Sequence, residues 1–416
     1  MGLLSFINKK SESRKPLHLI IDIDSGNNNC RGALSIMDNG IPKVLYSVSS
    51  APKIPPFPEQ EINHELVSSA LSNILSNIAD AIRSANSAKE NFAVDGVYCL
   101  LSSPYYLSHT TVINYNSNEE FLVTKDLVSD LIQKSITNPI SERIHGNSES
   151  MMEPVILSQK IVNISVNGYD TVNPYGLRGR ELKISVFNTR VPKILFNTIK
   201  NTISKYSTAN ISIEPFSIAS YVVLKNELSD ESDFILVNIE SEVTEVSLVK
   251  HHTILESVSF PFGNNNLIRH LSKKLNLPFN EVDSQLSLLN DGSLLASVAT
   301  KMLEGIEESK AEWFSYFENS MVMLSEEAHL PYTVHIISDK KMQKYFGNFA
   351  MNKGFASQAL VPDGFKINII DQEKLLDKCK FNESAIFDPS IALGTLFSYA
   401  QTDKLEETNK STSNKN

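Results

Sequence analysis

Residues 234–249, FILVNIESEVTEVSLV, place two apolar runs on either side of a short polar turn. Short apolar runs bounded by turn residues are typical of strands, so this stretch predicts a strand, a turn and a second strand. The centre of the turn holds Glu240, Ser241 and Glu242 and contains no glycine. A loop that wraps backbone N–H groups around a phosphate normally relies on glycine. The stretch therefore predicts a polar turn between two strands that lacks the glycines of a phosphate-binding loop.

Composition and charge limit the class of protein. The chain has 416 residues, of which 41% are apolar, and at about 150 residues per domain this length predicts two or three domains. The formal net charge of -10 argues against a nucleic-acid partner, because binding to phosphates needs a basic surface. Cys30, Cys99 and Cys379 have no paired spacing, which excludes a disulfide framework and a zinc knuckle and fits a reducing compartment.

Strands and helices are expected to alternate along the first half of the chain. Apolar residues at helical spacing predict a long helix over residues 64–85. Asn39-Gly40 predicts the turn of a hairpin whose strands cover residues 32–37 and 43–48. The other expected elements are strands over 17–23, 94–102, 110–115, 160–166 and 181–188, and helices over 124–136 and 193–206. Further on, residues 313–317 read WFSYF, a helix-borne aromatic cluster of the kind usually found in a core.

The sequence gives two indications about contact with a membrane. No run reaches the roughly 20 apolar residues of a membrane span, so we expect a cytoplasmic protein. Residues 1–10, MGLLSFINKK, nevertheless combine apolar and basic side chains, which can lie in a membrane interface. The residues expected to make this peripheral contact, at the inner face of the cell membrane, are Leu3, Leu4, Phe6, Ile7, Lys9 and Lys10. A frayed chain end is the alternative.

Three stretches, in a fixed order, carry a family resemblance. Residues 94–111 read VDGVYCLLSSPYYLSHTT, residues 168–186 read GYDTVNPYGLRGRELKISV, and residues 214–224 read EPFSIASYVVL. Together with residues 234–249 they resemble the FtsA and PilM group of the actin-like ATPase superfamily over nearly the whole chain. FtsA, to which the resemblance is nearer, acts in bacterial cell division, and PilM acts in type IV pilus assembly.

The resemblance implies an α/β, two-lobed actin-like fold of the ribonuclease-H type, with a small α+β subdomain inserted in the first lobe. The implied divisions are an N-terminal amphipathic segment (1–16), the first lobe in two parts (17–91 and 191–232), the inserted subdomain (92–190), the second lobe (233–400) and a polar, disordered tail (401–416).

The resemblance also implies contacts to a nucleotide phosphate in a first loop. The family has Asp, an apolar residue, Gly and then Ser or Thr. Here Asp22 and Ser25 match, whereas Asp24 replaces the glycine. A carboxylate at that position has the same charge as the ligand and blocks the close approach that glycine allows. Gly26 could restore the turn if the loop shifts by one residue.

The second phosphate loop departs further from the family pattern. Asn238 replaces the Asp that would hold a metal-bound water, and Glu245 replaces a later Asp. Only Thr244 matches, and Gly263 remains from a glycine pair. We therefore expect no catalytic residue and no metal site, with weak or absent binding of ATP and Mg²⁺. From the residues alone, Asp22 could equally cap a turn, and the glutamates could form an exposed acidic turn.

These expectations predict a pseudo-ATPase that acts as an adaptor. The main prediction is an FtsA-like scaffold that links a membrane-proximal complex to a cytoplasmic polymer, such as an FtsZ-like one, in cell division. The alternative is a PilM-like scaffold that captures a pilus membrane protein, and a second alternative is an active ATPase of the same superfamily. A homo-oligomer or filament is compatible with each.

A hairpin loop in the inserted subdomain is the expected partner-binding surface. Aromatic and arginine side chains are over-represented at binding hot spots, and the loop carries Tyr169, Tyr175, Arg178 and Arg180. The plainer interpretation is that Asn173-Pro174 and Gly176 only shape a turn.

Overall fold

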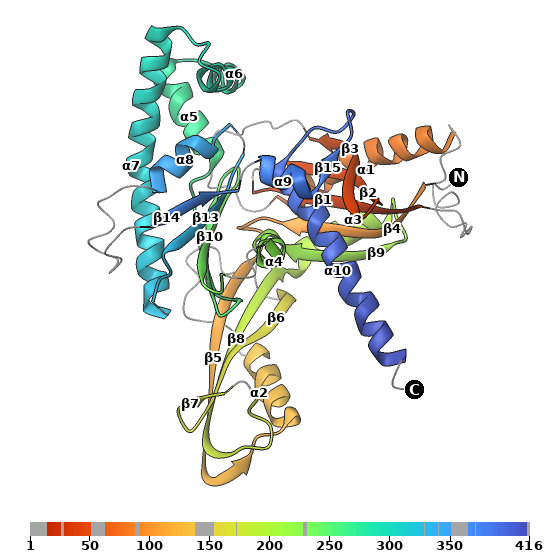
Figure 1. Ribbon diagram of the computed structural model, residues 1–416, viewed down its shortest axis with the longest axis vertical. Helices are drawn as coiled ribbons and strands as arrows, with labels where there is room; N and C mark the ends of the chain where they lie inside the picture. The colour runs from red at the N-terminus through yellow and green to blue at the C-terminus, as the bar shows by residue number, and fades with distance from the viewer. Residues whose placement is uncertain are drawn as a thin grey trace.

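The computed structural model describes residues 15–25, 29–50, 63–87, 92–137, 154–171, 173–227, 231–327, 329–339, 341–350, 365–370 and 372–413. These residues form one six-stranded, one five-stranded and one four-stranded sheet. The two larger sheets lie in two neighbouring lobes, and the four-stranded sheet projects away from both (Figure 1).

The sheet of the first lobe combines strands from both ends of the chain. In spatial order they are β15 (Lys380–Phe381), β3 (Ile41–Ser49), β2 (Cys30–Asp38), β1 (Lys15–Ile23), β4 (Phe92–Leu101) and β9 (Asn210–Pro215). β1 pairs antiparallel with β2 and parallel with β4. Asn39 and Gly40 turn β2 into β3 with φ of 53° and 80°, the positive values that a tight hairpin turn requires.

Helices cover both faces of this sheet. α1 (His64–Ser87) and α3 (Lys193–Ser204) pack on one face, where Leu71, Ile74 and Ile78 of α1 enter a core shared with β1. Their spacing is that of the apolar stripe of an amphipathic helix. α4 (Phe216–Glu227) and α10 (Pro389–Ser413) pack on the other face, and α9 (Gln372–Lys378) contacts α10.

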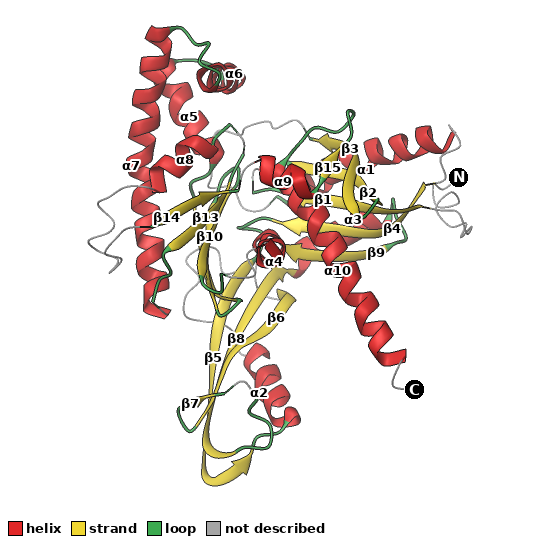
Figure 2. Cartoon of the chain, viewed as in Figure 1, coloured by secondary structure: helices red, strands yellow, loops and turns green. Residues whose placement is uncertain are grey.

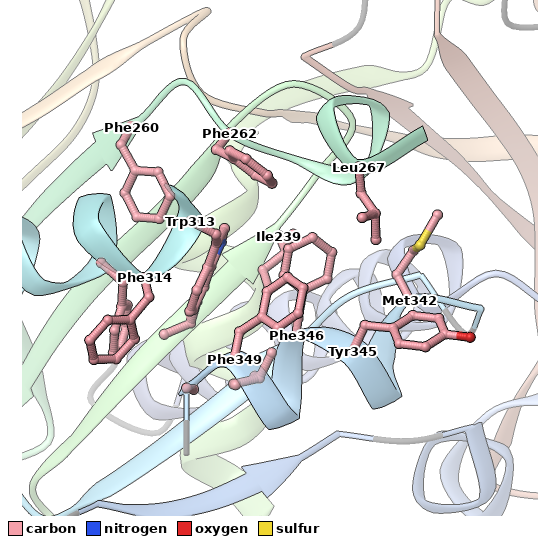
Figure 3. Packing of buried hydrophobic residues seen from close by; sticks show 14 of the residues in the cluster. Ile239, Phe260, Phe262, Leu267, Trp313, Phe314, Met342, Tyr345, Phe346 and Phe349 are labelled. Atoms are coloured by element: carbon pink, nitrogen blue, oxygen red, sulfur yellow. The ribbon is translucent and has the colours of Figure 1, made fainter. Parts of the chain in front are cut away.

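The second lobe has its helices on the outer side of its sheet. The strands, in spatial order, are β12 (Thr253–Phe260), β11 (Thr244–Lys250), β10 (Phe234–Ile239), β13 (Thr333–Ile337) and β14 (Lys366–Ile369). The outer helices are α5 (Asn264–Leu275), α6 (Phe279–Asn290), α7 (Ala296–Glu327) and α8 (Gln343–Ala350). Trp313 of α7 lies among Phe260, Phe346 and Phe349 in the core between them (Figure 3), as the aromatic cluster predicted.

A third core joins the two lobes. Along β10, Val237 and Ile239 face the outer helices, whereas Phe234 and Leu236 contact the cluster that contains α4 and α10. α4 lies between the lobes (Figure 2). Because side chains alternate along a strand, Asn238 points to the same side as Leu236, toward the first lobe.

The projecting sheet is the inserted α+β unit. Its strands, in spatial order, are β5 (Leu107–Leu122), β8 (Arg178–Pro192), β6 (Pro154–Val166) and β7 (Tyr169–Asp170), and α2 (Lys125–Thr137) covers one face. The hydroxyl of Thr124 accepts a hydrogen bond from the N–H of Leu127 at 3.1 Å, so it caps the N-terminus of α2.

The base of this sheet is also attached to the second lobe. The backbone N–H of Thr110 on β5 donates to Oε2 of Glu256 on β12 at 3.0 Å, and the Thr110 hydroxyl donates to the carbonyl of Leu255. Nδ1 of His109 lies 3.4 Å from the same oxygen of Glu256. The inserted unit therefore bridges the two lobes at its base.

The structure differs from the expected divisions at two places. Residues 92–101 form β4, which pairs with β1 and β9, so they belong to the sheet of the first lobe and not to the inserted unit. Most of β4 is buried, which suits an inner strand of a parallel sheet. Residues 401–413, expected to be disordered, continue α10 to Ser413.

The expected membrane contact cannot be placed on this fold. Leu3, Leu4, Phe6, Ile7, Lys9 and Lys10 all lie outside the described residues, as does Gly26 of the first phosphate loop. Within the described part of the chain, none of the helices has both the length and the apolar character that a bilayer crossing requires.

Candidate functional site

Two hairpin loops meet between the lobes, where the resemblance places a nucleotide phosphate. Ser241, between β10 and β11, donates to Asp24, after β1, with its backbone N–H at 3.1 Å and its hydroxyl at 2.7 Å. The next N–H, of Glu242, donates to the hydroxyl of Ser25 at 3.0 Å. The N–H groups that a phosphate loop would offer to a ligand are thus bonded to side chains of the opposite loop.

Asp24 is the centre of this contact. Its carboxylate is 3% exposed and accepts hydrogen bonds from five donors, two from Ser241 and one each from Ser25, Asn29 and Arg31. Burial by itself would raise the pKa of Asp24, but the charge of Arg31 and the bonds from Ser241 outweigh it and lower the pKa. Asp24 is therefore an ionised group held in place by the protein.

Arg31 on β2 supplies the balancing positive charge. Its guanidinium lies 2.5 Å from Asp22, 2.9 Å from Asp24 and 3.1 Å from Asp388, which precedes α10. Burial raises the pKa of Asp22 to about 7, although Arg31 opposes the shift. One arginine thus joins three carboxyl groups from two distant parts of the first lobe.

Glu240 lines what remains of the cleft. A cavity of about 30 Å³ lies between Glu240, Asp24, Arg31, Asn264 and Asp388. Burial, and next the charge of Asp24, raise the pKa of Glu240 well above its usual range, although a hydrogen bond with Ser102 opposes the shift. Burial therefore favours the neutral form of this carboxyl group. The cavity has room for a water or two, whereas ligand pockets occupy about 300–1,000 Å³.

Glu242 is bonded to α5 and does not line the cavity. Arg269 on α5 donates to both of its oxygens, at 2.9 and 2.5 Å, and Asn265 donates to Oε1 at 2.7 Å. Such two-pronged pairs of arginine and carboxylate are strong and directional. Glu242 therefore fastens the loop to α5.

Gly263 and the start of α5 complete this attachment. The N–H groups of Asn264 and Asn265 donate to the carbonyls of Glu240 and Ser241, each at 2.8 Å. A Cβ atom at Gly263 would lie 2.4 Å from the Glu240 carbonyl, so the close approach requires glycine. The first N–H groups of a helix can bind a phosphate, but these two are already bonded to the loop.

Thr244 and Asn238 are both fully buried, on neighbouring strands of the second lobe. The Thr244 hydroxyl donates to the carbonyl of Phe262 at 2.6 Å and accepts from Nε1 of Trp313 at 3.2 Å. Thr244 is therefore tied into the outer core. Asn238 is fully buried, and neither polar atom of its side chain has a partner among the described residues.

Glu245 bonds on the opposite side of β11. It accepts a hydrogen bond from the hydroxyl of Tyr106, which lies 3.0 Å from the hydroxyl of Ser217 on α4. Burial raises the pKa of Glu245 to about 7, although the bonds from Tyr106 and Ser217 oppose the shift. Three chain segments thus meet on one carboxyl group.

This shift predicts a dependence of stability on pH. The pKa of Glu245 is 4.5 when the group is free and about 7 in the fold, so its contribution is complete below the lower value and is lost as pH rises through the higher one. Between about pH 5 and 8 the urea midpoint should fall, and Glu245→Gln should reduce that fall. Glu307→Gln, at a side chain that is 67% exposed, should leave it unchanged. An equal fall in Glu245→Gln and in the unmodified protein would contradict the prediction.

The expected partner residues lie at the far end of the inserted unit. Tyr169 is 80% and Tyr175 is 39% exposed, and Arg178 and Arg180 are exposed on β8. Nζ of Lys125 lies 5.7 Å from the centre of the Tyr175 ring. These four side chains are accessible to another molecule. Their role in binding a partner stays a prediction.

Comparison with known proteins places the fold. No protein-family model matches the sequence, and no curated protein matches it either. Among solved structures, a chain of the PilM-PilN type IV pilus biogenesis complex is 12% identical, with 93% of this chain and 98% of that chain covered and a TM-score of 0.56.

Two further structures are similar at lower scores. The ethanolamine utilization protein EutJ from Carboxydothermus hydrogenoformans is 10% identical, with 95% and 93% covered and a TM-score of 0.44. A Bacteroides thetaiotaomicron protein of actin-like ATPase fold and unknown function is 8% identical, with 95% and 99% covered and a TM-score of 0.41.

The chain therefore has the actin-like ATPase fold, α/β with several sheets, which confirms the predicted fold class. At this level of identity the likeness establishes architecture and not activity.

Proposed function

We propose that this chain is a PilM-like cytoplasmic scaffold whose actin-like cleft is closed by its own side chains, and that it is not an ATPase. The observation that carries the proposal is the bond between the Asp24 carboxylate and the backbone N–H of Ser241, which fills a donor that a phosphate would need. The similarity to the PilM-PilN complex supports the pilus alternative over the cell-division one.

The cleft is a poor fit to magnesium and a triphosphate. Arg31 and the first N–H groups of the second loop are already bonded. In the part of the chain that the structure describes, no group of three or more His, Cys, Asp or Glu side chains is placed to hold a metal ion. Asn238 stands where the family has a carboxylate, and a neutral amide is a weaker ligand for Mg²⁺. No hydrolytic step is assigned to these residues.

Calorimetry with Mg-ATP tests the closed cleft. We expect no binding tighter than about 1 mM. Asp24→Gly restores the residue of the family pattern and frees the Ser241 N–H. A hydrogen bond to a charged group contributes about 1.5–3 kcal/mol, so the variant should bind at least about 10-fold more tightly.

Asp38→Gly is the matched control for this experiment, because Asp38 is 41% exposed at the far end of β2, and it should bind no better than the unmodified protein. Circular dichroism establishes that both variants are folded. A micromolar dissociation constant for the unmodified protein would refute the closed cleft.

The scaffold role requires a partner, and the exposed end of the inserted unit is the surface that we assign to it. By similarity to the PilM-PilN complex, the partner class is a membrane protein of pilus assembly. Tyr175, in the turn before β8, and Arg178, the first residue of β8, offer an exposed aromatic ring and guanidinium, the residue types that dominate binding hot spots.

Co-purification with a membrane protein of a type IV pilus system tests that surface. The double variant Tyr175→Ala and Arg178→Ala should weaken capture at least about 30-fold, the equivalent of one hot spot of about 2 kcal/mol. Tyr332→Ala removes a tyrosine that is 57% exposed on the second lobe and should leave capture unchanged. Equal capture by both variants would move the partner site elsewhere.

A further inference from the structure

An apolar pocket of about 380 Å³ opens in the first lobe, at the end of β1 opposite to the cleft. It lies between the C-terminal half of α1, the first residues of the inner strand β4 and the residues that follow α3. Its apolar lining includes Leu19, Leu75, Ile78, Ile82, Phe92 and Val94, and Arg83, Asn86 and Ser87 add polar groups. Its volume is within the range of about 300–1,000 Å³ that is typical of ligand sites.

The pocket lies beside the point where the chain enters the lobe. Lys15, the first residue of β1, pairs with Phe92, which lines the pocket. Ile7 precedes Lys15 by eight residues, and at about 3.3 Å per residue these span up to about 26 Å. The residues before Lys15 can therefore reach the pocket without any change in the sheet.

The chemistry of these residues matches the lining. Leu3, Phe6 and Ile7 are spaced i, i+3 and i+4, the spacing that puts three side chains on one face of a helical turn. A cavity of about 150 Å³ takes up a benzene ring, so the pocket has room for about two large apolar side chains. Lys9 and Lys10 follow them, and their charges would stay in solvent near the polar rim.

We propose that this pocket is the intramolecular docking site of the chain's own N-terminal segment, with Phe6 as the anchoring side chain. The docked segment covers the apolar lining and removes from solvent the same residues that would otherwise touch a membrane. Docking and membrane contact then exclude each other. The proposal is independent of the cleft and of the inserted unit, so it can fail while the proposed function stands.

Photo-crosslinking of the full-length chain tests the docking. With benzoylphenylalanine in place of Phe6, we expect crosslinks within one molecule to residues 75–87 or 92–94, identified by mass spectrometry. The same probe in place of Ser11, a polar residue of the same segment, should give few of them. Ala79→Trp places a large ring in the pocket from α1 and should abolish the Phe6 crosslinks.

Two results would overturn the proposal. Crosslinks from position 6 to these residues that occur only between two molecules would assign the pocket to a second copy of the chain. Crosslinks from position 6 to residues outside the pocket lining would show that the N-terminal segment does not dock there. Hydrogen exchange gives a second readout, because deletion of residues 2–10 should speed amide exchange in the second half of α1, and unchanged exchange would also count against docking.

Discussion

Replacement of Arg31 by alanine is expected to lower the free energy of unfolding by about 3–5 kcal/mol, the cost of leaving buried charges without their partner. Asp22 and Asp24 are 1% and 3% exposed, and both lie within hydrogen-bond distance of the Arg31 guanidinium. With arginine removed, Asp24 keeps the donors of Ser241 but loses the only cation bonded to it among the described residues. The predicted loss of stability is large because the Arg31 guanidinium contacts three carboxyl groups, two of which are buried.

Urea denaturation followed by circular dichroism measures this loss. Arg83→Ala is the matched control, because Arg83 pairs with Asp80 in a contact whose two side chains are 57% and 61% exposed. Exposed ion pairs contribute at most about 1 kcal/mol, so the control should stay close to the unmodified protein. An Arg31→Ala variant as stable as the control would mean that the three carboxyl groups do not depend on Arg31.

Replacement of Trp313 by alanine should cost a similar amount, about 3–5 kcal/mol, as other buried tryptophans do. Trp313 is fully buried in the outer core of the second lobe (Figure 3), and its ring stacks on Phe317 with centroids 4.9 Å apart. It also donates to Thr244 at 3.2 Å, so its loss removes packing beneath the second loop.

Two further variants separate packing from the hydrogen bond. Trp313→Phe keeps most of the ring but loses the donor to Thr244, and should cost less than Trp313→Ala. Tyr316→Ala removes a neighbouring ring that is 36% exposed and should cost less still. Thermal unfolding by circular dichroism ranks the three, and a Tyr316→Ala loss equal to that of Trp313→Ala would contradict the assigned core.

Much of the fold could be predicted because its signals are local. The helical spacing of Leu71, Ile74 and Ile78 is a property of about two turns of chain, and Asn39-Gly40 marks its hairpin within two residues. The actin-like class was implied by the resemblance of four stretches, in their order, to the FtsA and PilM group. The start of the inserted unit was misplaced because β4 pairs across the sheet with β1, a contact that local pattern does not reveal.

The candidate site was predicted only in part. Asp22, Asp24 and Ser25 were identified from their motif, but Arg31, Asp388 and Tyr106 were missed. Asp388 lies far along the chain from Arg31 and meets it only in the folded lobe. One signal was available, since an arginine next to the apolar strand residues of β2 indicates a buried partner of opposite charge.

The glutamates of the second loop show that the charge of a residue does not predict the direction of its side chain. The sequence places Glu240, Glu242 and Glu245 close together, where they could form an exposed acidic turn. In the fold they point in three directions, Glu240 into the small cavity, Glu242 to Arg269 and Glu245 to Tyr106. Their directions follow from the turn and the alternation of β11, whereas their partners come from other segments.

The attachment of the inserted unit to β12 has a mechanical consequence. β5 continues from Thr110 in regular pairing with β8 as far as Asn116, a lever of about 20 Å at about 3.3 Å per residue. Because Thr110 near its base is bonded to Glu256, a pull on the far tip is transmitted through β12 to β11 and to the loop that holds the lobes together. We expect such a load to act on the spacing of the two lobes. Single-molecule stretching between the tip and α7 would detect this coupling, and Glu256→Gln should weaken it.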